Sequence, residues 1–311
     1  KNFGSNQNVR VDMNKVTGEL HIYAQRHIVA EVGDDPNEIS LEEARKIDPR
    51  YEVDDIVETE VTPRNFGRIA AQNAKQVVVQ RIREAERGMV FEKFSSREND
   101  IVTGIIQRME NKNVYIDLGK AEAILTPNEQ IPGEIYQYHD RMKTYIVEVK
   151  KTSKGPQIMV SRTHPGLLKR LFELEVPEIH DGLVEIKSVA REPGMRSKIS
   201  VYTKDENIDP VGACVGHKGM RVQTIVNELR GEKIDIVKYS SEPDQYVANA
   251  LSPAKVVSTE VLEEEKICRV IVPDYQLSLA IGKEGQNARL AAKLTGWKID
   301  IKSESQARNF I

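Results

Sequence analysis

The chain has 311 residues, of which 39% are hydrophobic and 30% are charged, and its formal net charge is −3. This length exceeds that of a usual single domain, so we expect two to four units. The sequence contains no apolar run of about 18 residues and no charged-then-apolar leader, which predicts neither a membrane span nor a membrane partner. Cys214 and Cys268 lie in unrelated contexts without metal-ligand spacing. We therefore expect a cytoplasmic protein with no bound metal or other cofactor.

The net charge argues at first against nucleic acid, because a basic surface is the usual feature of a domain that binds it. The acidic excess lies in residues 1–95, which carry 14 Lys and Arg against 17 Asp and Glu. The rest of the chain is balanced, so RNA binding there would depend on converging basic residues, backbone contacts and stacking. We expect binding with a sequence preference.

The N-terminal part predicts a small sheet. Two strands around a turn at residues 14–18 form a hairpin, since apolar residues alternate along each of them: Val9, Val11, Met13, Leu20, Ile22 and Ala24. Ser40 and Glu43 make a capping box for a short helix that ends at Asp48 and Pro49. Residues 56–61 suggest one more strand.

A long amphipathic helix follows and is expected to close near Gly88. Its apolar stripe consists of Phe66, Ile69, Ala70, Ala74, Val77, Val78, Ile82 and Ala85. Such a stripe more often covers the sheet of its own domain than docks a partner. The sequence leaves both interpretations open.

From Asp100 the sequence changes to short strands separated by turn residues: 101–107, 113–118, 123–125, 144–149 and 157–161. Five short strands in succession indicate a small closed barrel of the oligonucleotide-binding architecture. On its face Tyr115 is a candidate for stacking a base, and Arg108, Arg141 and Lys143 for holding phosphates. The alternative is that Tyr115 packs inside the barrel and the cations are only solvated.

An internal repeat is the most informative feature of the chain. The sequence Gly-His-Lys-Gly at 216–219 recurs as Gly-Lys-Glu-Gly at 282–285, and the segment 231–236 recurs at 296–301 with nearly the same offset. Each repeat is interpreted as two strands, a short helix, a GxxG loop, a second helix and a last strand. Two landmarks in register make chance an unsatisfactory explanation.

A loop with glycine at both ends can approach a sugar-phosphate backbone that any Cβ would keep away. The helix after it directs its N-terminal NH groups and positive dipole end at phosphate. One GxxG usually marks a simple turn, but two in the same repeat favour nucleotide binding. The expected RNA-binding residues are Gly216, His217, Lys218, Gly219 and Arg221 in the first repeat, and Gly282, Lys283, Glu284, Gly285, Arg289 and Lys293 in the second. Because Glu284 neutralises the second loop, we expect the first loop to bind more tightly.

The repeats resemble KH domains, and their order of elements suggests the bacterial, type II variant. The barrel resembles an S1 RNA-binding domain at residues 101–106, 116–119 and 158–162. An N-terminal strand-and-helix domain, one S1 domain and two KH domains in this order resemble the NusA family of bacterial transcription factors. The stretches 66–72, 161–167 and 272–282 strengthen that resemblance.

The resemblance implies an α+β multidomain fold divided at 1–95, 96–163, 164–241 and 242–311. It implies a monomer that is no enzyme, that docks on RNA polymerase and that receives the single-stranded nascent transcript. With other antitermination factors it would modulate pausing, intrinsic termination and antitermination. The N-terminal domain of this family usually begins with helical sequence, which is not found before Lys1. We therefore expect that domain to be truncated at its start.

Three other functions agree less well with the sequence. S1 and KH domains also occur together in RNA-degradation accessory subunits, but the long helix and the second KH repeat do not fit them. An enzyme with a glycine-rich phosphate loop is disfavoured, because neither GxxG continues as GxxxxGK[ST] and no catalytic or metal-ligand set stands out. A purely structural scaffold would leave the doubled loop unexplained.

Overall fold

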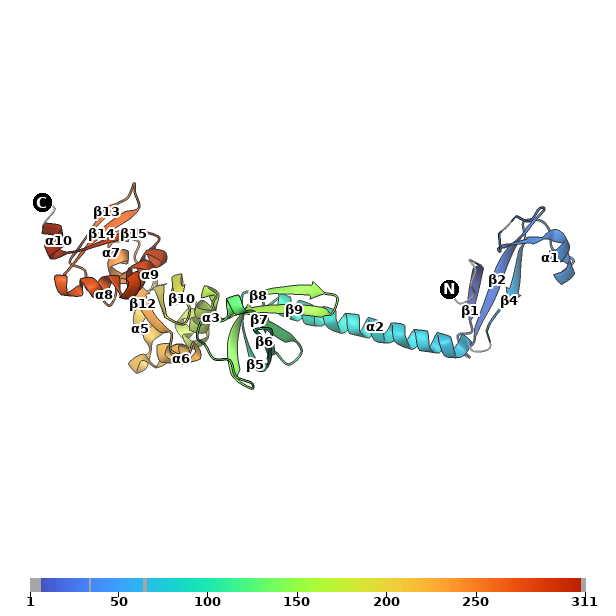
Figure 1. The fold of residues 1–311 in the computed structure, drawn as a ribbon, viewed down its shortest axis with the longest axis horizontal. Helices are drawn as coiled ribbons and strands as arrows, with labels where there is room; N and C mark the ends of the chain where they lie inside the picture. Colours follow the sequence, from blue (N-terminus) through green and yellow to red (C-terminus); the bar gives the residue numbers. More distant parts are fainter. Residues whose placement is uncertain (1–6, 34, 64–65, 309–311) are drawn as a thin grey trace. The chain divides into compact units, whose positions relative to one another are not determined.

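A computed structural model of the chain describes residues 7–33, 35–63 and 66–308 (Figure 1). It divides into two compact units, Lys1–Glu86 and Arg87–Ile311, which are described separately. None of the helices in the described ranges combines the length and the apolar character that crossing a membrane requires. The fold is mixed α and β, as predicted.

The first unit is built on one sheet and a short helix. Strand β2 pairs antiparallel with β1 and β4 and parallel with β3. Ser40 Oγ accepts a hydrogen bond from the backbone N–H of Glu43 at 3.2 Å, which confirms the predicted helix cap. Ile28, Ile39, Ala44 and Val57 form the small core. The elements are β1 (Asn8–Met13), β2 (Leu20–Val29), β3 (Glu38–Ser40), α1 (Leu41–Ile47) and β4 (Ile56–Glu60).

The long helix α2 (Phe66–Ser95) runs past Gly88, so the prediction that it closes there is wrong. A glycine inside a helix costs only about 1 kcal/mol relative to alanine. The last turns offset this cost, because Phe94 is buried in the core of the barrel that follows.

Four residues of the apolar stripe of α2 are exposed to solvent. Ile69, Val77, Val78 and Ile82 are between 37% and 57% exposed. The interpretation that this stripe covers its own sheet is therefore wrong for these four residues, because covered side chains would have lost this solvent contact. The side chain of Phe66 lies outside the described part of the chain.

The second unit begins with a closed barrel of the predicted kind, in which the strands follow the order β5-β6-β7-β9-β8. Alternate residues point inward, so Val114 and Ile116 are fully buried in a core that also holds Ile158 and Val160. The elements are β5 (Ile101–Glu110), β6 (Asn113–Asp117), β7 (Glu122–Leu125), a 3-10 turn (Pro127–Glu129), β8 (Arg141–Thr152) and β9 (Gly155–Ser161).

Both repeats adopt the same topology. In each, the middle strand pairs antiparallel with the first strand and parallel with the last. The first repeat consists of α3 (Pro165–Glu175), α4 (Pro177–His180), β10 (Glu185–Glu192), β11 (Arg196–Tyr202), α5 (Pro210–Val215), the turn η2 (His217–Gly219), α6 (Met220–Glu228) and β12 (Lys233–Lys238). The second consists of α7 (Pro243–Ala250), β13 (Ser258–Leu262), β14 (Ile267–Val272), η3 (Asp274–Gln276), α8 (Leu277–Ile281), η4 (Lys283–Gly285), α9 (Gln286–Thr295), β15 (Lys298–Ser303) and α10 (Glu304–Arg308).

Buried contacts join the two repeats. Ala190 of β10 belongs to the hydrophobic core of the second repeat. The Tyr246 hydroxyl lies 2.8 Å from Ser200 Oγ, and the fully buried Lys198 Nζ donates to the Ser252 carbonyl at 2.8 Å. Because β12 ends only a few residues before α7 begins, the repeats have little freedom to move independently.

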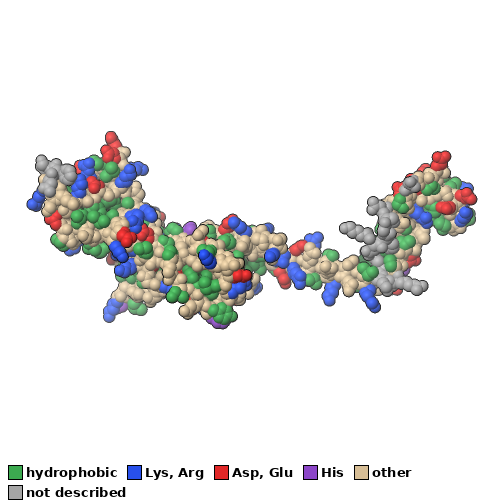
Figure 2. All heavy atoms as spheres, viewed as in Figure 1, with side chains coloured by type: hydrophobic (Ala, Val, Ile, Leu, Met, Phe, Trp, Pro, Cys, Tyr) green, Lys and Arg blue, Asp and Glu red, His purple; other side chains and the backbone are tan. Residues whose placement is uncertain are grey.

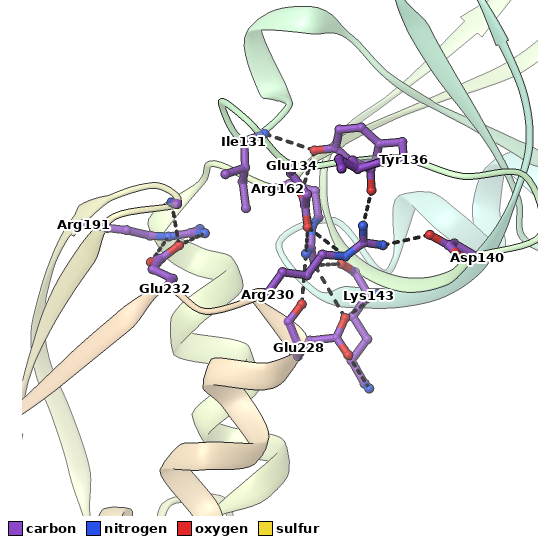
Figure 3. Close-up of polar contacts among 12 residues, drawn as sticks. Ile131, Glu134, Tyr136, Asp140, Lys143, Arg162, Arg191, Glu228, Arg230 and Glu232 are labelled. Atoms are coloured by element: carbon purple, nitrogen blue, oxygen red, sulfur yellow. Dashed lines mark hydrogen bonds and ion pairs between the residues drawn. The ribbon is translucent and has the colours of Figure 1, made fainter.

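An arginine network joins the barrel to the first repeat (Figure 3). Arg162 is fully buried and donates to both carboxylate oxygens of Glu134, whose side chain is only 2% exposed. It also donates to the carbonyls of Lys143 at 2.9 Å and Glu228 at 3.0 Å. Since Glu228 is the last residue of α6, the helix behind the first GxxG loop is anchored directly to the barrel.

Candidate nucleic-acid interface

The two GxxG loops share one backbone conformation. Gly216 has φ 74° and ψ 176°, and Gly282 has φ 78° and ψ 169°. The third residue of each loop, Lys218 or Glu284, is left-handed with φ of 51° or 54°. The closing glycines are left-handed too, with φ of 77° and 74°. A repeat recognised in the sequence is therefore also a repeat in three dimensions.

The two glycines of each loop have different structural roles. A Cβ on Gly216 would lie 2.6 Å from Arg221 Cγ, and a Cβ on Gly282 would lie 2.8 Å from both Cβ and the backbone N of Asn287. The first glycine therefore allows the second helix to pack closely against the loop. A Cβ on Gly285 would meet nothing within 4 Å, so the closing glycine faces open space where a ligand backbone can approach.

The middle residues of the loops point into solvent. His217 and Lys218 are exposed in the first loop, as are Lys283 and Glu284 in the second. Lysine in the first loop and glutamate in the second thus occupy the same left-handed position. The charge difference inferred from the sequence is a difference at equivalent sites.

Arg221, which was predicted to extend the first loop, is held by contacts within the first repeat. Its Nη1 donates to Glu178 Oε2 at 2.9 Å and to the Ala213 carbonyl at 2.6 Å, because the absent Cβ of Gly216 leaves room for it to turn inward. Asn287 takes the equivalent place in the second repeat, and its Nδ2 donates to the carbonyls of Leu251 and Ala280. Both side chains fasten the helix that precedes their loop.

Arg289 and Lys293 lie on α9, behind the second loop. Arg289 forms an ion pair with Glu192 of the first repeat, with Nε 2.6 Å from Oε1 and Nη2 3.1 Å from Oε2. Its Nη1 also donates to the Glu284 carbonyl at 3.1 Å. Lys293 is exposed, and it joins Arg289 in lowering the pKa of Glu192. Arg289 is therefore held by another repeat in the free protein, which the sequence did not predict.

The structure brings together two of the four candidates on the barrel. Tyr115 is half-buried on the outer face, since its neighbours Val114 and Ile116 point inward, and the Arg108 guanidinium lies 4.1 Å from its ring centroid. The alternative that Tyr115 packs inside is therefore wrong. Glu122 accepts two hydrogen bonds of 2.9 Å from Arg108, so the charge of this guanidinium is largely neutralised.

The other two candidates differ. Arg141 is exposed and pairs across the strands with Ile105 of the same outer face. Lys143 is instead drawn to the first repeat, where its backbone N–H donates to Glu228 Oε1 at 2.9 Å and its Nζ lies 3.3 Å from Glu228 Oε2. Lys143 is therefore paired with Glu228 in the free protein, and its role in binding phosphate stays a prediction.

Comparison with known proteins matches four domain families in order along the chain. The family model of the NusA N-terminal domain matches residues 1–88, and that of the S1 RNA binding domain matches 95–161. The NusA-like first and second KH domains match residues 162–239 and 243–309. Together these matches cover nearly the whole chain.

Proteins named transcription termination/antitermination protein NusA are similar along their length. The protein of Halalkalibacterium halodurans is 68% identical over 99% of this chain and 81% of its own length, and that of Bacillus subtilis is 67% identical over 99% and 83%. The protein of Thermus thermophilus is 44% identical over 95% of this chain and 76% of its own length. The chain belongs to the NusA family. It therefore carries the RNA-binding S1 and KH domains of a transcription termination/antitermination protein.

Charge is interspersed over the barrel and KH domains of this NusA-family chain. The face drawn in Figure 2 shows Lys and Arg beside Asp and Glu, with no uniformly basic area. Within the described residues no group of three His, Cys, Asp or Glu is placed to hold a metal ion. Recognition would accordingly depend on local geometry at the loops more than on bulk electrostatics.

Two residues that shape the KH loops were not predicted from the sequence. Asn287 occupies the position of the second repeat that corresponds to Arg221 in the first, so aligning the repeats could have shown that one side-chain donor replaces the other. Glu192 is far from Arg289 in the sequence, and no periodicity or motif connects them. Only the packing of one KH domain on the other reveals that contact.

Proposed function

We propose that this NusA-family chain binds single-stranded nascent RNA through its two KH loops while it associates with bacterial RNA polymerase. In this way it modulates pausing, intrinsic termination and antitermination, and it acts as a monomer without catalysis. The observation that carries the proposal is the pair of GxxG loops with one backbone conformation, held on joined KH domains. One RNA strand that reaches both loops gains from the high effective concentration at the second.

The lysines of the loops are the proposed phosphate contacts. Lys218 and Lys283 are exposed, and the closing glycine of each loop leaves room for a sugar-phosphate backbone to approach. Arg108 and Tyr115 on the barrel are proposed as a secondary contact, in which Tyr115 stacks a base. Because Glu122 already pairs with Arg108, we expect this contact to contribute less than the loops.

Reversal of charge at both loops tests RNA binding. The Lys218→Asp/Lys283→Asp variant is expected to bind a short single-stranded RNA about tenfold more weakly or worse, since each aspartate repels a phosphate that lysine attracted. Fluorescence anisotropy at several salt concentrations measures this, and circular dichroism verifies folding. Lys46→Asp/Lys75→Asp, which makes the same charge change at exposed lysines of the first unit, should bind nearly as the parent chain does. Equal affinity of the two double variants contradicts binding at the loops.

The exposed stripe of α2 is the proposed surface for RNA polymerase. Val78 and Ile82 are one helical turn apart and are 56% and 52% exposed. Val78→Gln/Ile82→Gln keeps good helix formers but removes apolar area, so co-elution with purified bacterial RNA polymerase in size-exclusion chromatography should decrease. RNA affinity of the same variant should not change. Undiminished co-elution would assign docking to another surface.

A further inference from the structure

A carboxylate of the first KH domain lies against the loop of the second. Glu192 is the last residue of β10, and its side chain is only 17% exposed. It accepts hydrogen bonds from Arg289 at 2.6 and 3.1 Å and from Gln286 Nε2 at 2.9 Å. Gln286 is the first residue of α9 and directly follows the closing glycine of the loop. The carboxylate is therefore close to the helix end where we expect a phosphate.

The guanidinium of Arg289 connects this carboxylate to the loop itself. While Nε and Nη2 hold Glu192, Nη1 donates to the carbonyl of Glu284, the left-handed residue of the loop. Arg289 is nearly half exposed in spite of these bonds. A phosphate that reaches the loop can thus reach the same guanidinium.

The first loop has no equivalent arrangement among the described residues. The residue of the first repeat that corresponds to Arg289 is Gln223, which donates to Asn227 within its own helix. The arginine of the first loop, Arg221, turns under Gly216 into the fold. The two loops therefore differ in their own charge. They also differ in the neighbouring side chains that an incoming anion can contact.

Carboxylate and phosphate compete for arginine, because both accept two parallel hydrogen bonds from the guanidinium fork. Both are also stabilised near the positive end of a helix. We propose that Glu192 is an internal competitor of RNA at the second KH loop. It occupies Arg289 in the free protein, and a phosphate binds tightly there only by replacing it. This inference rests on the proposed RNA binding and adds the residue that sets the strength of the second loop.

The contact can be removed without separating the KH domains. Lys198 and Ser252, Tyr246 and Ser200, and the burial of Ala190 hold the two domains together elsewhere. Gln at position 192 would keep the size of the side chain and one accepting oxygen, while it removes the negative charge and replaces the second acceptor by an NH2 donor. The fold is therefore expected to persist in such a variant.

Glu192→Gln in the full chain tests the competition. We expect it to bind single-stranded RNA about threefold to tenfold more tightly. Because Arg289 becomes available to a phosphate, the slope of log affinity against log salt concentration should become steeper by about one. Glu185→Gln is the matched control, since it removes the same charge from the other end of β10, where Glu185 pairs with Lys187 at 2.8 Å. Its affinity should stay within about twofold of that of the parent chain.

Three results would overturn the inference. Unchanged or weaker binding by Glu192→Gln, while Lys218→Asp/Lys283→Asp still loses RNA, would show that Glu192 only positions Arg289 and would leave the proposed function intact. An equal gain in Glu185→Gln would show a general effect of charge. Full binding by the double lysine variant would remove the proposed RNA site, and the competition with it.

Discussion

Replacement of Arg162 by alanine is expected to lower the free energy of unfolding of the barrel and KH unit by about 3–5 kcal/mol. The side chain of Arg162 is completely buried, and the side chain of its partner Glu134 is 2% exposed. Alanine would leave that carboxylate without its main partner in a place that excludes water. It would also leave the carbonyls of Lys143 and Glu228 without their donor.

The expected loss is the cost of an unpaired charge, so a second change should relieve it. Glu134→Gln in the Arg162→Ala background is expected to recover part of the stability, because a neutral amide costs less to bury than a carboxylate. Urea unfolding of the full chain, followed by circular dichroism, measures all members of this double-mutant cycle. A loss below about 1 kcal/mol for Arg162→Ala would mean that Arg230, whose Nε lies 3.5 Å from Glu134, replaces it.

Replacement of Gly282 by alanine is expected to destabilise the second KH domain more than the same change at Gly285. Both glycines have a positive φ, but ψ is 169° at Gly282 and 14° at Gly285. Gly285→Ala therefore bears the cost of an ordinary left-handed residue, about 1–2 kcal/mol, whereas Gly282 lies in a region essentially confined to glycine and its replacement should cost more. Only at position 282 does the new Cβ lie 2.8 Å from a backbone nitrogen, that of Asn287. The overlap should add about 1–3 kcal/mol, because helix α9 must shift to relieve it.

RNA binding should separate the two variants in another way. The methyl group of Gly285→Ala stands in open space on the side where an RNA backbone would approach. This variant is therefore expected to weaken RNA binding although it keeps most of its stability. Urea unfolding and anisotropy on the same preparations measure both effects. Equal stability of the two variants would contradict the packing role assigned to Gly282, and unchanged affinity of Gly285→Ala would contradict the open side as the RNA face.

Periodicity and repetition were enough to predict most of the fold. Five short runs separated by turn residues predicted the barrel strands, and two landmarks that recur with nearly the same offset predicted the paired KH domains. The end of α2 was predicted wrongly, because a weak local signal at Gly88 yields to the burial of Phe94 in a core that follows later in the chain. Local preferences determine an element unless a distant hydrophobic contact outweighs them.

The features of the site also divide into those set by local sequence and those set by distant contacts. The sequence by itself determined the GxxG loops, their glycines and the lysines at their tips, because these depend on backbone conformation within each short loop. Only the tertiary structure decided which carboxylates the neighbouring arginines and lysine pair with. Arg221, Arg289 and Lys143 are each paired with a carboxylate from another element, Glu178, Glu192 and Glu228. An ion pair forms wherever folding brings opposite charges within a few ångströms, and the spacing of residues along the chain does not contain that information.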